Sequence, residues 1–128
     1  MRPPAPPRRR GPLRILLVDD QPEVRRALGE MLASAGHTVV TAAGGSEALH
    51  LLEGDAAIEL VVTDLVMPGM TGWELAAAVK VRRPALPVGI VTGWGDLPHA
   101  ESGAHSAVDF ILAKPVMLDA LHEAIARV

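Results

Sequence analysis

Five polar residues that could do chemistry stand directly after short apolar runs. Asp19 and Asp20 follow one run, Asp64 follows a second, Thr92 a third and Lys114 a fourth. Clustered carboxylates repel one another, and Mg²⁺, which takes oxygen ligands and often shares phosphate oxygens, would relieve that repulsion. A lysine and a hydroxyl beside such a metal could bind a phosphoryl group, and a carboxylate can itself be the nucleophile that accepts it. These residue types therefore indicate phosphoryl chemistry, provided that the fold brings them together.

The segment around Asp64 predicts how that residue is positioned. An apolar run rich in β-branched residues, 61–63, ends at the carboxylate, and Met-Pro-Gly follows as a turn at 67–69. Thr71 and Glu74 then have the Thr-x-x-Glu form of a helix capping box. This order of strand, acid, turn and helix places Asp64 at the carboxyl end of a strand, where open α/β sheets bind their ligands.

The rest of the chain alternates strand-like and helix-like segments. The five predicted strands are residues 14–18, 38–42, 58–63, 87–91 and 107–112. The five helix-length segments are residues 22–35, 44–54, 71–83, 96–106 and 118–128, of which 96–106 has the weakest apolar periodicity. Such alternation predicts an α/β fold with a parallel sheet and helices on both faces. The carboxyl ends of its strands would share one edge, so the polar residues should converge there.

Composition limits the function classes. The 128 residues suffice for one domain with a core, and 49% hydrophobic against 2% aromatic residues predicts an aliphatic core. The absence of cysteine excludes disulfides, thiolate metal sites and a cysteine nucleophile. Seven basic and 15 acidic residues follow Arg14, a net charge of −8, and this acidic body argues against a nucleic-acid groove on the folded part.

Residues 1–12 are rich in proline and arginine and are predicted to be a disordered leader before a single domain at 13–128. They could be a solvated leader or the end of a linker from an upstream domain. An Arg-rich contact for an acidic partner and a Pro-rich ligand are the functional alternatives. The apolar run 13–18 is too short for the core of a secretion signal, and no stretch is long enough to span a bilayer. We therefore expect a soluble, cytoplasmic protein with no membrane partner.

Four segments resemble one known family when they are taken together. They are LLVDD, TDLVMPGMTGWEL, VTG and FILAKP, in this order and at the family's spacing. Over about residues 13–128 the chain resembles the receiver (response-regulator, CheY-like) domain of bacterial two-component signalling. The resemblance implies a five-stranded parallel sheet in the order 2-1-3-4-5, with helices on both faces, in a doubly wound, flavodoxin-like arrangement.

The resemblance also implies roles for single residues. Asp64 would accept a phosphoryl group from a histidine kinase or a phosphotransfer protein. Mg²⁺ would be held by Asp19, Asp20, Asp64 and the carbonyl of Val66. Thr92 and Lys114 would bind the phosphoryl oxygens.

The same resemblance implies a switch, not a turnover enzyme. Rearrangement at the phosphoryl group would move the face formed by residues 96–106, the strand 107–112 and the last helix. That face would contact a protein output partner or a second copy of the chain. The peptide bond between Lys114 and Pro115 would be cis.

One position departs from the family pattern. Family members usually carry Tyr or Phe three residues before the lysine, where this chain has Ile111, with Phe110 next to it. Adjacent side chains of a strand point to opposite faces, so Phe110 is not expected to replace the missing aromatic residue. Coupling between Thr92 and an aromatic side chain is therefore not expected in its usual form.

Other interpretations remain open. A small Mg²⁺-dependent phosphatase with an aspartyl-phosphate intermediate would use the same residue types, but its nucleophile would follow the first strand in an Asp-x-Asp arrangement. A docking or dimerisation scaffold would leave the acceptor unused, and a flavin or nucleotide site lacks its glycine-rich loop. Singly, the acids after the first strand could be helix caps. The five histidines have no metal-ligand spacing and are interpreted as surface residues.

Overall fold

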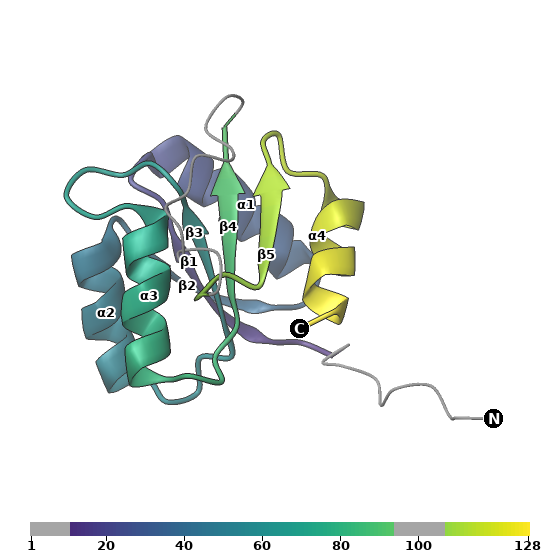
Figure 1. The fold of residues 1–128 in the computed structure, drawn as a ribbon. Helices are drawn as coiled ribbons and strands as arrows, with labels where there is room; N and C mark the ends of the chain where they lie inside the picture. The colour runs from purple at the N-terminus through teal and green to yellow at the C-terminus, as the bar shows by residue number, and fades with distance from the viewer. Residues whose placement is uncertain (1–10, 94–106) are drawn as a thin grey trace.

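The chain forms a five-stranded parallel sheet between two layers of helices (Figure 1). The computed structural model describes residues 11–93 and 107–128. Its elements are β1 (Arg14–Val18), α1 (Pro22–Ser34), β2 (Thr38–Ala42), α2 (Gly45–Gly54), β3 (Leu60–Asp64), α3 (Gly72–Arg82), β4 (Val88–Thr92), β5 (Phe110–Ala113) and α4 (Leu118–Ala126). The strand order is β2-β1-β3-β4-β5 and every neighbouring pair is parallel, which confirms the predicted topology.

The two faces of the sheet bury separate aliphatic cores. Leu16 and Val18 of β1 pack with α2 and α3, while Ile15 and Leu17, which alternate with them, pack with α1 and α4. In Figure 1, α2 and α3 accordingly lie together on one side of the sheet. Near-continuous burial of β1, β3 and β4 is what a parallel sheet covered on both faces requires. None of the helices in the described part of the chain is long and apolar enough to cross a bilayer.

The segment after β3 folds as its sequence predicts. The Thr71 side chain accepts a hydrogen bond from the Glu74 backbone N–H at 3.1 Å, and the Glu74 carboxylate accepts one from the Thr71 N–H at 2.9 Å, which completes the capping box. Gly72 then lets α3 begin against the end of β3. A Cβ there would lie 2.5 Å from the Asp64 carbonyl oxygen.

Three strands differ from their predicted bounds: β3 is Leu60–Asp64 instead of 58–63, β4 is Val88–Thr92 instead of 87–91, and β5 is Phe110–Ala113 instead of 107–112. β3 and β4 each end one residue later, so that Asp64 and Thr92 are the last residues of their strands. β5 begins at Phe110 instead of residue 107, because the Asp109 carboxylate accepts the backbone N–H of Val88 at 2.7 Å before strand pairing starts. The predicted helical segment 96–106 lies outside the described residues.

Candidate functional site

Three carboxylates converge at the carboxyl edge of the sheet. The register pairs Val18 with Thr63 across β1 and β3, so the strand ends that carry the acids lie side by side. One carboxylate oxygen from each of Asp19, Asp20 and Asp64 lies within 4.8 Å of the others. The structure thus brings together three of the four predicted metal ligands, the carboxylates.

Asp19 is the most constrained of the three. Its side chain is 1% exposed, its backbone N–H donates to the Ala42 carbonyl at 3.1 Å, and its Oδ1 accepts the Gln21 N–H at 2.9 Å. Its Oδ2 is buried and accepts no hydrogen bond within the described residues. Gln21, not Asp20, is the N-cap residue of α1, and it caps without a side-chain bond. The alternative that these acids serve only as helix caps is therefore wrong.

The charge of Asp19 is unfavourable in the protein without a metal. Burial is the main cause that raises the pKa of its carboxyl above the ordinary value of 3.8, and the carboxylates of Asp64 and Asp20 raise it further. The Gln21 N–H and the Lys114 ammonium oppose this shift. A buried carboxylate that is repelled by two others favours a cation as its missing partner.

Asp64 occupies the end of a central strand. Its side chain is almost buried, and the Leu65 backbone N–H donates to its Oδ1 at 3.0 Å. Its backbone is fixed as well: the Leu65 N–H also points to the Val91 carbonyl at 3.1 Å, and the Thr63 hydroxyl donates to the Asp64 carbonyl at 2.9 Å. Its carboxylate is therefore held in one place at the edge of the sheet.

Lys114, which follows the edge strand β5, lies beside the acids. Its Nζ lies 3.1 Å from Asp64 Oδ1 and 3.9 Å from Asp19 Oδ2. Its backbone N–H donates to the Thr92 carbonyl at 2.9 Å, and its bond to Pro115 is cis, as the resemblance implied. One ammonium against three carboxylates leaves the cluster with a net negative charge.

Thr92 and Val66 lie near this cluster without joining it. Thr92 is fully buried at the end of β4, and its hydroxyl donates to the Gly93 carbonyl at 3.3 Å. The Val66 side chain is 60% exposed beside the site. A role of Thr92 toward a phosphoryl oxygen, and of the Val66 carbonyl toward a metal, remain predictions.

The donor set fits Mg²⁺. The three groups that could bind a metal are all carboxylates, at least one of their oxygens is buried without a hydrogen-bond donor, and the cluster carries excess negative charge. These are the properties of a site for a hard divalent cation. None of the three side chains, all aspartates, offers a nitrogen or sulfur ligand.

Two residues of β5, Phe110 and Ile111, bear on the departure from the family pattern at position 111. Phe110 packs with the core of α1 and α4, and its ring covers Gly89, where a Cβ would collide with it. Ile111 is half-buried and pairs with Ile90 in the neighbouring strand. The alternation argument is confirmed: the ring of Phe110 lies on the other face and does not occupy the position of the missing aromatic residue.

Sequence reasoning missed two side chains. Arg25 Nη1 donates to the Asp19 carbonyl at 2.7 Å. A helical side chain leans toward its own N-terminus, so an arginine in the second turn after an acid pair was the available signal. His37 is not a free surface residue, because its Nδ1 accepts the Leu13 N–H at 3.0 Å. His50 and His122 are exposed as expected, whereas His99 and His105 lie outside the described residues.

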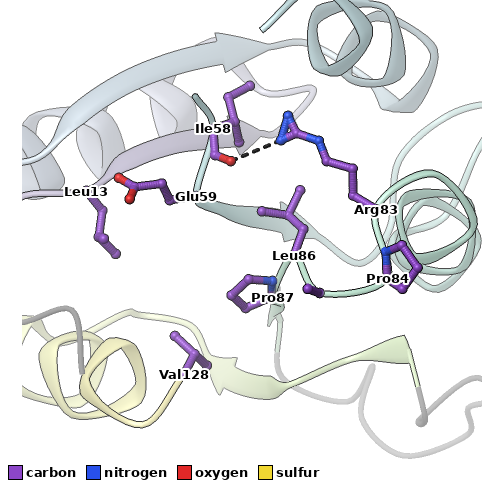
Figure 2. Close-up of a pocket in the computed structure, with 9 residues that line it drawn as sticks. Leu13, Ile58, Glu59, Arg83, Pro84, Leu86, Pro87 and Val128 are labelled. Carbon is purple, nitrogen blue, oxygen red and sulfur yellow. Dashed lines mark hydrogen bonds between the residues drawn. The ribbon is translucent and has the colours of Figure 1, made fainter. Parts of the chain in front are cut away.

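A separate hollow lies at the opposite edge of the sheet (Figure 2). This cavity of about 450 Å³ is lined by apolar side chains such as Leu86 and Val128, together with Glu59 and Arg83. The guanidinium of Arg83 is engaged there, since its Nη1 donates to the Ile58 carbonyl at 3.0 Å. No cluster of carboxylates lines this hollow, so it is not the predicted site.

Comparison with known proteins identifies the family. The profile of the response regulator receiver domain matches residues 15–126. The chain is 41% identical over 114 residues to the transcriptional regulatory protein GlrR of Escherichia coli (strain K12), which covers 89% of this chain and 26% of that protein. It is 38% identical over 112 residues to the sensor histidine kinase RcsC of Salmonella typhi, covering 88% of this chain and 12% of that protein. The chain thus spans about a quarter or less of these relatives.

Solved structures agree. A response regulator receiver domain protein from Clostridium thermocellum superposes with a TM-score of 0.83 at 30% identity, over 90% of this chain and 92% of that one. The response regulator TrrA of Thermotoga maritima, solved in complex with Mg²⁺ and BeF, gives a TM-score of 0.77 at 31% identity over 90% and 97% of the two chains. A complex of TrrA with the histidine kinase ThkA gives 0.78 at 30% identity, over 90% of this chain and 97% of that one. With its topology, its acidic cluster and these similarities, the chain belongs to the response regulator receiver domain family.

Proposed function

We propose that the chain is the phosphoryl-accepting receiver of a two-component phosphorelay and that Asp64 is the acceptor. The observation that carries this proposal is the almost buried Asp64 carboxylate, 3.1 Å from the Lys114 ammonium and within the cluster of three acids. The phosphodonor would be a phosphohistidine of a histidine kinase or phosphotransfer protein. An Asp64 oxygen forms the new bond to phosphorus while the bond from phosphorus to the histidine nitrogen breaks, and the imidazole leaves with its electron pair and takes up a proton.

Asp19, Asp20, Asp64 and the Val66 carbonyl would hold Mg²⁺. The cation would neutralise negative charge on the phosphoryl oxygens and on the acids around them. Without it, three carboxylates would repel the incoming anion. The fit rests on the orphaned Oδ2 of Asp19 and on the oxygen-only donor set.

Lys114 and Thr92 would bind the transferred group. Lys114 already lies in contact with the acceptor carboxylate, so its ammonium can exchange that contact for a phosphoryl oxygen. The Thr92 hydroxyl, which now donates to the Gly93 carbonyl, would turn to donate to another oxygen. The backbone bond from Lys114 to the Thr92 carbonyl links the two movements.

The output follows from where these two residues sit. Thr92 ends β4, and Lys114 follows β5 just before α4. Phosphorylation would therefore favour one of two arrangements of β5, α4 and the segment 96–106, and this face would bind a protein partner or a second copy of the chain. The half-buried Ile111 would transmit the change by packing alone, without an aromatic ring that moves.

The test is phosphorylation by a small phosphodonor with Mg²⁺. We expect an acid-stable, base-labile adduct on the wild-type protein and none on Asp64→Asn. Asp119→Asn is the matched control, because Asp119 is an exposed aspartate in the first turn of α4. An adduct that persists in Asp64→Asn would overturn the assignment of the acceptor.

Two alternative functions would reveal themselves in the same experiment. Sustained turnover of phosphate esters that Asp64→Asn abolishes would indicate a phosphatase. Partner binding that is the same for wild type and Asp64→Asn, with no adduct from a kinase or from a small donor, would indicate a scaffold.

A further inference from the structure

Arg25 of α1 reaches back to the loop that carries the acid pair. Its Nη1 donates to the backbone carbonyl of Asp19 at 2.7 Å, and the residue is half-buried. We infer that Arg25 is a positioning residue, which holds Asp19 in the place where it can bind Mg²⁺. This inference rests on the proposed function, since it concerns the same metal site.

The hydrogen bonds of Asp19 explain why Arg25 alone among the side chains of the described residues can position it. The Asp19 N–H is bound by Ala42, its Oδ1 by the Gln21 N–H, and its carbonyl by Arg25. Within the described residues, Arg25 is the one side chain that hydrogen-bonds Asp19, whose other two hydrogen-bond partners are backbone groups. Oδ2 alone is left to face the cluster.

The bond from Arg25 matters because the negative charge of Asp19 is unfavourable where its carboxylate lies. The carboxylates of Asp64 and Asp20 repel it, and burial removes the water that would stabilise it. A loop held by fewer bonds would relax and let the carboxylate turn toward solvent. The bond from Arg25 works against that relaxation, and a charged donor on a backbone carbonyl is among the stronger kinds of hydrogen bond.

A second role for Arg25 predicts the opposite result. A cation beside three acids repels Mg²⁺, so if Arg25 acted only through its charge, its removal would strengthen Mg²⁺ binding. If Arg25 positions Asp19, its removal weakens Mg²⁺ binding. The sign of the change separates the two.

The neighbouring Arg26 provides a matched control. It carries the same charge one residue along α1 and is exposed, and its side chain makes no hydrogen bond or ion pair with residues 11–93 or 107–128. Removing it changes the net charge of the protein as removing Arg25 does, without touching Asp19.

The experiment is a titration of the full chain with Mg²⁺ alone, followed by tryptophan fluorescence and repeated with Mn²⁺ by electron paramagnetic resonance. We expect Arg25→Met to weaken binding about tenfold, the usual cost of losing a group that orients a metal ligand. Arg25→Lys should fall between this variant and wild type, because an ammonium does not reproduce the geometry of a guanidinium. Arg26→Met should stay within about twofold of wild type, as a screened surface charge.

Each outcome decides. Unchanged or tighter binding in Arg25→Met overturns the positioning role, as does wild-type affinity in Arg25→Lys, which carries the test if Arg25→Met does not fold. If Arg26→Met weakens binding as much as Arg25→Met, the loss does not come from the bond to the Asp19 carbonyl and the inference is wrong. A wild-type protein that binds no Mg²⁺ overturns the proposed metal site as well, so the two failures are distinguishable.

Discussion

Aspartates lie at both edges of the sheet, but their charges are paired at one edge and left partly unpaired at the other. At the amino edge, Asp55 Oδ2 accepts hydrogen bonds from Arg14 Nε and Nη2 at 2.8 and 2.6 Å, and this pairing is the main cause that lowers the pKa of Asp55 below its ordinary value. At the carboxyl edge, burial and neighbouring acids raise the pKa of Asp19. The surroundings of Asp55 favour its anionic form, whereas the surroundings of Asp19 disfavour its anionic form.

The rest of the amino edge follows the same rule of complete pairing. Asp109 Oδ2 accepts the Lys80 ammonium at 2.9 Å and the Val88 N–H at 2.7 Å, while Arg83 Nη2 donates to the Asp55 carbonyl at 2.7 Å. These pairs hold the starts of the strands in place, and the carboxylates of Asp55 and Asp109 already have cationic partners. The incomplete pairing at the other edge costs stability and leaves the negative charge that the proposed cation would neutralise, which is the usual exchange at functional sites.

The largest effect that would test this contrast is the loss of a predicted metal ligand. Asp19→Asn should weaken Mg²⁺ binding about 100-fold, the upper end of what loss of a supporting group costs. In the absence of Mg²⁺ the same variant should have a higher free energy of unfolding than wild type, because a buried, repelled charge is replaced by an amide that can donate to the other acids. Mg²⁺ titration and urea unfolding measure the two quantities.

Its counterpart is Asp55→Asn at the amino edge. This variant should lose stability and keep the Mg²⁺ affinity of wild type, since Asp55 lies away from the acid cluster and is paired with Arg14. If both variants shifted stability in the same direction, the contrast between the two edges would not hold.

A smaller effect is expected at the start of β5. Asp109→Ala should lower the free energy of unfolding by about 2 kcal/mol, because the Val88 N–H and the Lys80 ammonium lose an acceptor. Mg²⁺ affinity should not change. Urea unfolding measures the loss, with the exposed Asp119→Ala as a control that should stay within about 0.5 kcal/mol of wild type.

The smallest effect is a dependence on pH at the amino edge. Burial is the main cause that lowers the pKa of His37 below its ordinary value of 6.5, and nearby His122 lowers it further. The unfolded chain then binds the proton more readily, so the contribution of His37 is complete above pH 6.5 and is lost as the pH falls below that value. Protonation also breaks the bond from the Leu13 N–H.

We expect this loss to be about 1 kcal/mol, the net value of one hydrogen bond. It is measured as the difference between wild type and His37→Gln in urea unfolding at pH 7.5 and at lower pH. Gln can still accept the Leu13 N–H but does not titrate. A variant that loses as much stability as wild type on acidification would show that His37 is not responsible.

Patterns that repeat along the chain predicted the fold and most of the site. Apolar runs of strand length, four of them followed by a polar residue, predicted a parallel sheet and placed the acids and Lys114 at one edge, because parallel strands end together. The strand order was implied by the resemblance to the receiver family. The start of β5 was misplaced because the Asp109 carboxylate takes a backbone N–H that strand pairing would otherwise use. Arg25 and His37 were missed for a related reason. Their partners are backbone groups of Asp19 and Leu13, and the spacing of residues in the sequence does not predict hydrogen bonds to backbone groups.

The dispersal of the cluster over the chain has a thermodynamic consequence. Its acids follow β1 and end β3, so they are far apart in the sequence and the pairing of these strands brings them together. A cation that binds them therefore binds the folded protein alone and draws the folding equilibrium toward it. At a concentration 100 times its dissociation constant this linkage adds about 2.7 kcal/mol. The melting temperature should then rise with Mg²⁺ concentration, which makes the ion a reporter of whether β1 and β3 are paired.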